Sequence, residues 1–463
     1  GDHRDLHSFP TRRSSDLGIA GRITYNYDNR YFVEGNFGYN GSENFSPNHR
    51  FGFFPSIALG YVVSNEKFFA PIRDVVSMVK LKASYGLVGN DQIGGDRRFI
   101  YNETVIGGGK YYFGTTPSQY TSVRLGEFPN PNVGWEKAKK LNLGADLSFF
   151  NQLNISVDYF KENREGIFLQ RKSIPMYVGL STKPWVNIGK MRNSGIDASL
   201  EYHQPLGKDL HLTVRGNFTY ARNRIMDQDE PDYAYTYMNH SGQMQWQKFG
   251  LVAAGLFQDQ EDIDSWAKQS FGEVKPGDIK YLDLNGDGIV DNYDTKPIGY
   301  SDIPEIVYGF GFSLQWKAFD LSAFFQGVAH VSFSTLTDQT QAFVGRNLKE
   351  SSVFADLYGN TWTPENPGAK YPRMTTGAID NNNQLSTFWM ANGRYLRLKN
   401  LELGYTLPKR IANKIAMQSL RVYLSGVNLF TFSPFKLWDP DLQTGATNYP
   451  NNRIINLGLT IGF

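Results

Sequence analysis

One segment of the sequence spaces oxygen-bearing side chains in the way that a calcium-binding loop does. It runs from Asp283 to Asp294 and reads DLNGDGIVDNYD. The ligands of a 12-residue EF-hand loop stand at positions 1, 3, 5, 7, 9 and 12, with a glycine at position 6 for the sharp turn. Hard oxygen donors favour Ca²⁺ over softer metals, so we predict an EF-hand-like Ca²⁺ site. Gly288 stands at the turn, and the predicted ligands are Asp283, Asn285, Asp287, Ile289 (through its carbonyl oxygen), Asp291 and Asp294.

Two features distinguish this segment from a complete EF-hand. The last ligand position holds Asp294 where the EF-hand has glutamate, so bidentate closure of the loop is weaker. No helix-forming sequence flanks the loop on either side. The alternative is a solvated acidic turn, because Asp, Asn and Gly are also common turn residues.

Other candidates for catalysis are unconvincing, and we predict that the protein is not an enzyme. The sequence has no cysteine, which excludes a thiol nucleophile and cysteine-ligated metals. The glycines of Val105–Lys110 (VIGGGK) lack the spacing of a phosphate-binding loop and predict a flexible loop. Glu261 and Asp262 indicate solvated charge rather than a glycosidase pair. The histidines accompany no H-E-x-x-H or G-x-S-x-G motif and are scattered, at His3, His7, His49, His203, His211, His240 and His330.

Aromatic residues make up 15% of the chain, and some of them gather in segments that do not alternate as strands do. These segments are Tyr111–Phe113, Trp185 and Tyr233–Trp246 (YAYTYMNHSGQMQW). Their rings could stack on sugars or pack on peptides. The alternative is that they pack against neighbouring loops.

Period-two alternation recurs down the chain and predicts β-strands with two different faces. Leu81, Ala83 and Tyr85, for example, alternate with Lys82 and Ser84. The clearest stretches are 31–39, 79–87, 141–149, 153–159, 210–220, 308–316, 321–325 and 455–463. Helix-period segments do not exceed about ten residues, and the best short candidates are 74–79 and 409–417.

The connectors between these stretches are unequal. Tight turns, such as Asp28-Asn29 and Asn151-Gln152, alternate with long polar segments at 89–136, 162–187, 227–307 and 331–395. Short turns at one end and long loops at the other are typical of outer-membrane β-barrels. A lipid face alternating with a wet lumen face also reconciles the aromatic content with a mean hydropathy of −0.43. A soluble sandwich or propeller is the alternative.

The pattern of the C-terminal residues favours a membrane barrel over a soluble fold. Ile455, Leu457, Leu459 and Ile461 alternate with small or polar residues, and Phe463 ends the chain. A last strand with a terminal aromatic residue resembles the assembly signal of outer-membrane barrels, whereas in a soluble protein such an apolar edge promotes aggregation. A net charge of +2 without a basic run excludes a nucleic-acid surface. We therefore predict an all-β fold, a transmembrane antiparallel β-barrel with long extracellular loops.

Six stretches of the sequence form a set of motifs in a fixed order. They are NGSENFSPNHRFGFFPSIALGY (40–61), LKASYGLVGN (81–90), NPNVGWE (130–136), WTPENPGAKYPR (362–373), FWMANGRYLRLKNLELGYTLPK (388–409) and LRVYLSGVNLFTFSPFKLWDPD (420–441). Together, and in this order, they resemble the C-terminal part of the SusC/RagA family of TonB-dependent outer-membrane transporters. The resemblance implies roughly 12–15 strands of a barrel of the 22-stranded type, with the plug domain and early strands missing.

The same resemblance implies a function and partners. It implies active import of large nutrients, oligosaccharides or oligopeptides, through the outer membrane of a Gram-negative bacterium of Bacteroidota type. A SusD-like surface lipoprotein would cover the barrel, and the TonB complex would act through the missing N-terminal region. The alternatives are an outer-membrane barrel enzyme or adhesin and a soluble lectin-like β protein.

Residues 1–17 (GDHRDLHSFPTRRSSDL) show neither strand alternation nor the apolar core of a signal peptide. They can be back-translated, in frame, to a common sequencing adapter. We therefore predict that they are not native and that residues 18–463 are the C-terminal portion of a receptor barrel. The alternative is a native basic tail. An incomplete barrel leaves backbone groups unpaired in lipid, so we expect this chain alone neither to insert nor to conduct ions.

Overall fold

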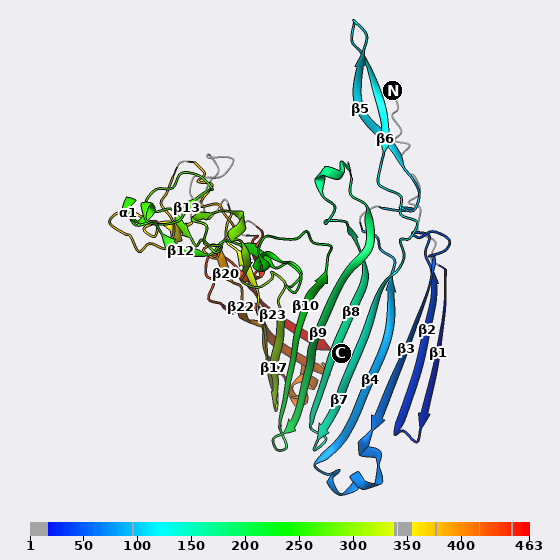
Figure 1. The fold of residues 1–463 in the computed structure, drawn as a ribbon. Coiled ribbons are helices and arrows are strands. Elements are labelled where there is room, and N and C mark those ends of the chain that lie inside the picture. Colours follow the sequence, from blue (N-terminus) through cyan, green and yellow to red (C-terminus); the bar gives the residue numbers. More distant parts are fainter. Residues whose placement is uncertain are drawn as a thin grey trace, which may run out of the picture.

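A large antiparallel sheet of 13 strands dominates the computed structural model (Figure 1). The structure describes residues 17–94, 97–180, 182–337, 340, 354–375, 377–415, 417–445 and 448–463. Each strand pairs with the next strand of the sheet along the chain. The number of strands agrees with the predicted 12–15. The strands are β1 (Leu17–Tyr27), β2 (Tyr31–Gly41), β3 (Phe51–Val62), β4 (Val76–Asn90), β7 (Glu136–Phe149), β8 (Leu153–Gln170), β9 (Trp185–Pro205), β10 (Leu210–Asp227), β17 (Ile306–Trp316), β18 (Phe319–Ala329), β21 (Tyr395–Thr406), β22 (Ser419–Phe432) and β23 (Ile454–Gly462).

This sheet, which we call the wall, has one apolar and one polar face. Leu143 lies opposite Ala83 on β4 and Tyr159 on β8, so apolar side chains form a continuous row across strands. Leu143 and Tyr159 are 46% and 40% exposed. In water such a face would be buried against another layer, so the wall is built for apolar surroundings. Within the described residues β1 and β23 are the two edges of the sheet, and they do not pair with each other.

The connectors at one end of the wall are short. They are residues 28–30, 150–152, 206–209 and 317–318, together with two longer connectors that contain helical turns. The connector at 63–75 carries η1 (Val63–Asn65) and η2 (Lys67–Ile72), and the connector at 407–418 carries α2 (Lys409–Ala412) and η7 (Asn413–Ile415). The helix predicted at 409–417 is thus confirmed over its first two turns. The helix predicted at 74–79 is wrong, because β4 begins at Val76 and its alternation continues from there.

At the other end, the long segment 91–135 contains a hairpin of β5 (Val105–Phe113) and β6 (Ser118–Leu125) that projects from the wall (Figure 1). The prediction of a flexible loop at Val105–Lys110 is therefore wrong. The pairing shifts register between Gly107 and Lys110, so the glycines form an irregularity in a strand. The β-formers that follow, Tyr111 to Phe113, hold the register of the hairpin.

Two other long segments, 228–305 and 330–394, fold together into what we call the loop body, at the left of Figure 1. Their apolar residues form one core, with Leu251, Ile279 and Tyr281 from the first segment and Leu357 and Trp389 from the second. None of the helices in the described part of the chain is long and apolar enough to cross a membrane. The loop body contains η4 (Thr236–Met238), β11 (Lys248–Gly250), β12 (Ala253–Leu256), α1 (Gln260–Asp264), β13 (Lys268–Gln269), β14 (Ile279–Tyr281), β15 (Ile289–Val290), η5 (Asn292–Asp294), β16 (Lys296–Ile298), β19 (Ser332–Ser334), η6 (Ala355–Leu357) and β20 (Met390–Asn392).

Candidate functional site

The predicted calcium loop lies in the loop body, where it follows β14, includes β15 and ends at η5. Its acidic side chains fold the loop by accepting hydrogen bonds from its own backbone. Asp283 accepts from the backbone nitrogens of Gly286 and Gly288 at 2.7 and 2.8 Å. Asp287 accepts from the nitrogen of Ile289 at 2.8 Å. The loop is therefore a closed turn that its carboxylates organise.

Asp294 is the buried end of this turn, with 0% exposure. One of its carboxylate oxygens accepts from the backbone nitrogen of Leu284 at 2.6 Å, and the other from that of Asp291 at 2.8 Å. Asp291 and Asp294 also form the capping box of η5. Asp294 therefore joins the start of the loop to its end.

Among the described residues, no group of three or more His, Cys, Asp or Glu side chains is already arranged as a metal site. Each carboxylate that accepts a backbone hydrogen bond still has unused lone pairs. The Ca²⁺ site at Asp283, Asn285, Asp287, Ile289, Asp291 and Asp294 therefore stays a prediction.

The aromatic segment Tyr233–Trp246 packs beside this loop. The hydroxyl of Tyr237 donates to the backbone oxygen of Tyr293 at 2.7 Å, and the ring of Tyr235 lies 6.2 Å from that of Tyr293. His240 stacks on Phe249 at 3.9 Å between ring centroids, and its burial lowers the pKa of the imidazole. Most of these rings are thus used in contacts within the loop body.

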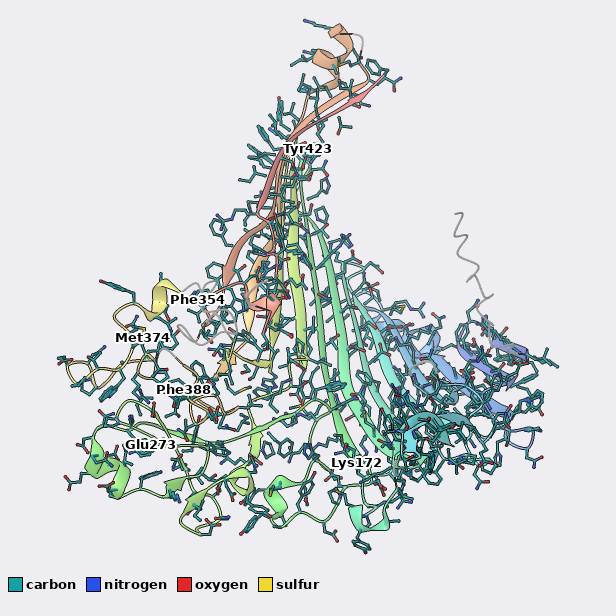
Figure 2. The ribbon with its side chains drawn as sticks, turned by 90° about the horizontal axis from the view of Figure 1, so that it is seen from above. Lys172, Glu273, Phe354, Met374, Phe388 and Tyr423 are labelled. Carbon is teal, nitrogen blue, oxygen red and sulfur yellow. The ribbon has the colours of Figure 1, made fainter. Side chains whose placement is uncertain are left out.

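Trp185, the first residue of β9, packs against a second core cluster, which includes Phe45 and Val133. Its ring stacks on Phe168 at 5.2 Å, and the guanidinium of Arg97 lies 4.1 Å from its centroid. Tyr111 and Phe113 on the hairpin are in contrast 57% and 63% exposed. Seen from above, Phe354, Met374, Phe388 and Glu273 lie in the loop body, and Lys172 lies in the connector between β8 and β9 (Figure 2).

Asp278 joins the two segments of the loop body and is 0% exposed. Asn382 donates to one of its oxygens at 2.9 Å, and Arg373 donates to the other at 3.1 Å. A buried carboxylate requires such partners, so this network fixes the pairing of the two segments. The sequence did not single out Asp278. Arg373, however, ends the stretch WTPENPGAKYPR, which was one of the six carrying the resemblance.

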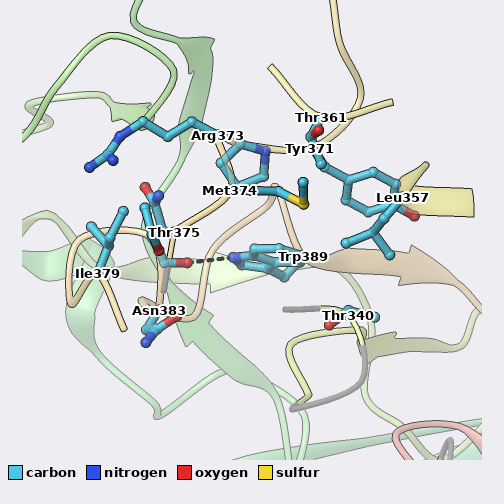
Figure 3. A pocket seen from close by; sticks show the side chains of 12 residues that line it. Thr340, Leu357, Thr361, Tyr371, Arg373, Met374, Thr375, Ile379, Asn383 and Trp389 are labelled. Carbon is cyan, nitrogen blue, oxygen red and sulfur yellow. Dashed lines mark hydrogen bonds between the residues drawn. The ribbon is translucent and has the colours of Figure 1, made fainter. Parts of the chain in front are cut away.

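A small cavity lies next to this network (Figure 3). Tyr371, Met374, Ile379 and Trp389 line it, and the indole nitrogen of Trp389 donates to the backbone oxygen of Asn382 at 2.8 Å. Its volume is ≈ 40 Å³, whereas pockets for small ligands measure roughly 300–1,000 Å³. The cavity has room for water but not for a nutrient.

Two larger hollows have the size of ligand sites. A groove of ≈ 650 Å³ lies between the loop body and the loop that joins β22 to β23, and it is lined by Phe354, Phe388, Phe435 and Asp356 among others. A hollow of ≈ 610 Å³ lies on the polar face of the wall, where its lining includes Lys82. Both combine apolar surface with charged groups, as ligand sites do.

Ion pairs cover the polar face of the wall. The ammonium of Lys82 lies 2.7 Å from Asp146 and 3.4 Å from Asp158, so three neighbouring strands are linked. Arg421 on β22 lies 2.5 Å from both Asp320 on β18 and Glu402 on β21. This face is therefore wettable, as the alternation predicted.

One row on the wall has the composition of a catalytic triad. His203 lies 3.1 Å from the hydroxyl of Thr213 and 3.2 Å from Glu201. These residues stand on neighbouring strands, and Arg215 also pairs with Glu201 at 2.9 Å. The row is a cross-strand ladder of polar side chains between β9 and β10.

Comparison with known proteins gives a consistent result. The family described as "TonB dependent receptor-like, beta-barrel" matches residues 5–429. TonB-dependent receptor P3 of Formosa agariphila is 30% identical over 474 residues, which are 96% of this chain and 45% of that protein. TonB-dependent receptor SusC of Bacteroides thetaiotaomicron is 27% identical over 487 residues, covering 99% of this chain and 45% of that protein. The chain thus spans about half the length of these relatives.

The fold agrees with solved structures. The structure of the RagAB peptide transporter superposes with a TM-score of 0.74 at 23% identity, covering 97% of this chain and 48% of that chain. The RagAB peptide importer in its 'open-open' state gives a TM-score of 0.75 at 22% identity. The resemblance to SusC/RagA transporters and the barrel fold are confirmed. The boundary at residue 17 stays a prediction, and residues 1–16 lie outside the described residues.

Proposed function

Because the chain belongs to the β-barrel family of TonB-dependent receptors, we propose that it forms part of the wall of an outer-membrane importer of large nutrients, oligosaccharides or oligopeptides. The observation that carries the proposal is the two-faced wall. Its apolar face suits lipid and its face of ion pairs suits a wet lumen. Transport of this kind needs energy but no covalent chemistry, and we propose that the TonB complex supplies the energy.

A SusD-like surface lipoprotein is the partner that we propose at the loop end. The family resemblance supports it, and so does the extent of loop surface at this end of the wall. The groove beside Phe354 and Phe388 is large enough for part of an oligomeric ligand. Its aromatic and charged lining suits sugars or peptides.

The test uses the full-length receptor in the bacterium that encodes it. Deletion of the gene is expected to abolish uptake of one class among labelled oligosaccharides and oligopeptides, and loss of TonB is expected to have the same effect. Affinity purification of the receptor in detergent should recover the lipoprotein in equal amount. Unchanged uptake of every tested ligand after deletion would contradict the proposed import.

We also propose that the loop from Asp283 to Asp294 binds Ca²⁺. The ligand spacing supports this, and so does the way Asp294 joins the two ends of the loop. Bound Ca²⁺ would stiffen the loop and, through the contact between Tyr237 and Tyr293, the aromatic segment beside it.

Substitution of Asp283→Ala together with Asp287→Ala in the full-length receptor tests the site. Terbium luminescence sensitised by nearby tyrosines, such as Tyr293, is expected to disappear in the double variant. Asp264→Asn, at the end of α1 in the same loop body, is the matched control and should leave the signal unchanged. Equal terbium binding by the double variant and the unmodified receptor would refute the site.

A further inference from the structure

The connector between β3 and β4, residues 63–75, exposes an apolar surface at the short-turn end of the wall. Phe68, Ile72 and Val75 are 70%, 51% and 49% exposed, whereas the neighbouring Phe69 is 6% exposed. The connector is thus anchored by Phe69 and presents the preceding residue, Phe68, outward. Large exposed apolar groups that lie together on an ordered segment indicate a binding surface.

Glu66 fixes this connector to the apolar face of the wall. Its carboxylate accepts hydrogen bonds from the hydroxyls of Tyr31 at 2.6 Å and Tyr61 at 3.3 Å. Tyr31 and Tyr61 are opposite each other on β2 and β3, and their rings stack at 5.1 Å. Tyr61 alternates in phase with Leu59, so both tyrosines lie on the apolar face. The connector therefore leaves the wall on the lipid side.

The exposed surface continues the row of aromatic side chains around this end of the wall. Tyr27 stacks on Tyr31 at 6.5 Å and is 55% exposed. On the other side, the backbone nitrogen of Phe150 donates to the oxygen of Val75 at 2.9 Å, and Phe150 is 58% exposed. Amphipathic aromatic residues concentrate where a membrane meets water. The connector is thus continuous with a row of exposed aromatic side chains at this end of the wall.

We propose that the connector at 63–75 is an interfacial foot, with Phe68 and Ile72 inserted among the acyl chains of the leaflet at the short-turn end. The occupant of this surface is phospholipid, because the surface is continuous with the lipid-facing side of the wall. Amphipathic segments bury their apolar side roughly 5–10 Å into the boundary between headgroups and acyl chains. This inference rests on the proposed function, since it requires the wall to lie in a membrane.

Site-directed spin labelling of the full-length receptor in phospholipid vesicles tests the foot. This part of the receptor has no cysteine, so Phe68→Cys places a unique nitroxide within it. Ile57→Cys, in mid-β3 on the apolar face, reports on lipid, and Thr116→Cys, at the tip of the hairpin, reports on water. The ratio of oxygen to nickel-chelate accessibility at position 68 is expected to be several-fold higher than at 116 and lower than at 57.

The labels at positions 57 and 116 distinguish failure of the foot from failure of the membrane location. If the label at 57 reports lipid and the label at 68 matches the one at 116, the foot is wrong and the proposed function stands. If the label at 57 also reports water, the membrane location fails as well. A photoactivatable phospholipid, applied to the receptor without any substitution, gives a second measurement. Adducts are expected on peptides covering 63–75, and adducts on β3 alone would overturn the proposal.

Discussion

The wall and the loop body distribute their apolar residues in opposite ways. Leu143 and Leu457 of the wall are 46% and 78% exposed, whereas Ile279 and Tyr281 of the loop body are 0% exposed. In the part of the chain that the structure describes, no second layer covers the apolar face of the wall, while the loop body encloses an apolar core and the buried carboxylate of an ion pair. The wall therefore needs a lipid environment to satisfy its apolar face, and the loop body is stabilised by its own packing.

The wall and the loop body are therefore stabilised by different interactions. Backbone hydrogen bonds between neighbouring strands hold the wall together, and its side chains set which face meets lipid. In the loop body the regular elements are short, so packing and buried polar contacts carry more of the stability. Substitutions in the two regions should therefore have different kinds of effect on stability.

The largest effect that we predict is aggregation on removal of detergent, and its cause is the apolar face of the wall. The purified chain is expected to aggregate when detergent falls below its critical concentration, because the apolar face of the wall then meets water. Light scattering and sedimentation velocity measure this directly. A monodisperse species without detergent would contradict the membrane wall and favour the soluble lectin-like alternative.

Within the loop body, Trp389→Ala is expected to cost about 3–5 kcal/mol of local stability, as large-to-small substitutions in a core do. Trp389 is 2% exposed, and its indole nitrogen donates to the oxygen of Asn382. Hydrogen exchange by mass spectrometry should show faster exchange throughout the loop body of the full-length receptor. Exchange in the wall should stay as it is.

Tyr358→Ala is the matched control, because Tyr358 belongs to the same loop body and is 91% exposed. Its effect should stay within about 0.5 kcal/mol. If both variants exchanged alike, the loop body would not have the enclosed core that distinguishes it from the wall.

On the wall, Leu143→Arg is expected to cost about 2–4 kcal/mol, because it places a charge on the lipid face near the bilayer midplane. The preceding residue, Asn142, lies on the polar face, so Asn142→Arg should cost much less. Unfolding of the receptor in liposomes by guanidinium chloride measures both. Equal costs at the two positions would mean that the two faces of β7 do not meet different environments.

The strands of the wall could be predicted well from the sequence, because each must alternate to separate lipid from lumen. The stretches at 141–149 and 153–159 lie within β7 and β8, and the turn between them lies where it was expected. Some strands extend further than the sequence predicted. Strand β8 continues to Gln170 because its last residues pair with β9, although they no longer alternate clearly.

The loop body could not be predicted in the same way, since its contacts join residues far apart in the sequence. Asp278 and Asn382 approach only because two separate loops fold together, and neither residue stands in a local motif. The acidic loop was visible because its folding is local, through contacts such as that of Asp283 with Gly288. Local spacing thus predicts a turn, whereas packing between loops is set by the tertiary fold.

The smallest effect that we predict concerns an ion pair at the surface of the loop body. The carboxylate of Asp356 accepts hydrogen bonds from the ammonium of Lys370 at 2.5 Å and from the hydroxyl of Tyr371 at 2.6 Å. These contacts, that of Lys370 first, hold the pKa of Asp356 below its ordinary value. The folded chain therefore binds this proton less readily than the unfolded chain. The stabilisation is complete above the ordinary aspartate pKa of about 3.9 and is lost as the pH falls through the lowered pKa.

Asp356→Asn should remove this acid-dependent loss of stability, with a small effect at neutral pH because exposed pairs contribute little. Hydrogen exchange of the peptide containing Tyr371, followed between pH 5 and pH 3 with correction for the intrinsic rate, measures the difference. Glu273→Gln is the control, since Glu273 is 85% exposed and lies 3.9 Å from Lys275. Only the Asp356→Asn variant should lose the acid-dependent decrease in stability. Persistence of the acid-dependent loss in the Asp356→Asn variant would show that the contacts of Asp356 with Lys370 and Tyr371 do not cause it.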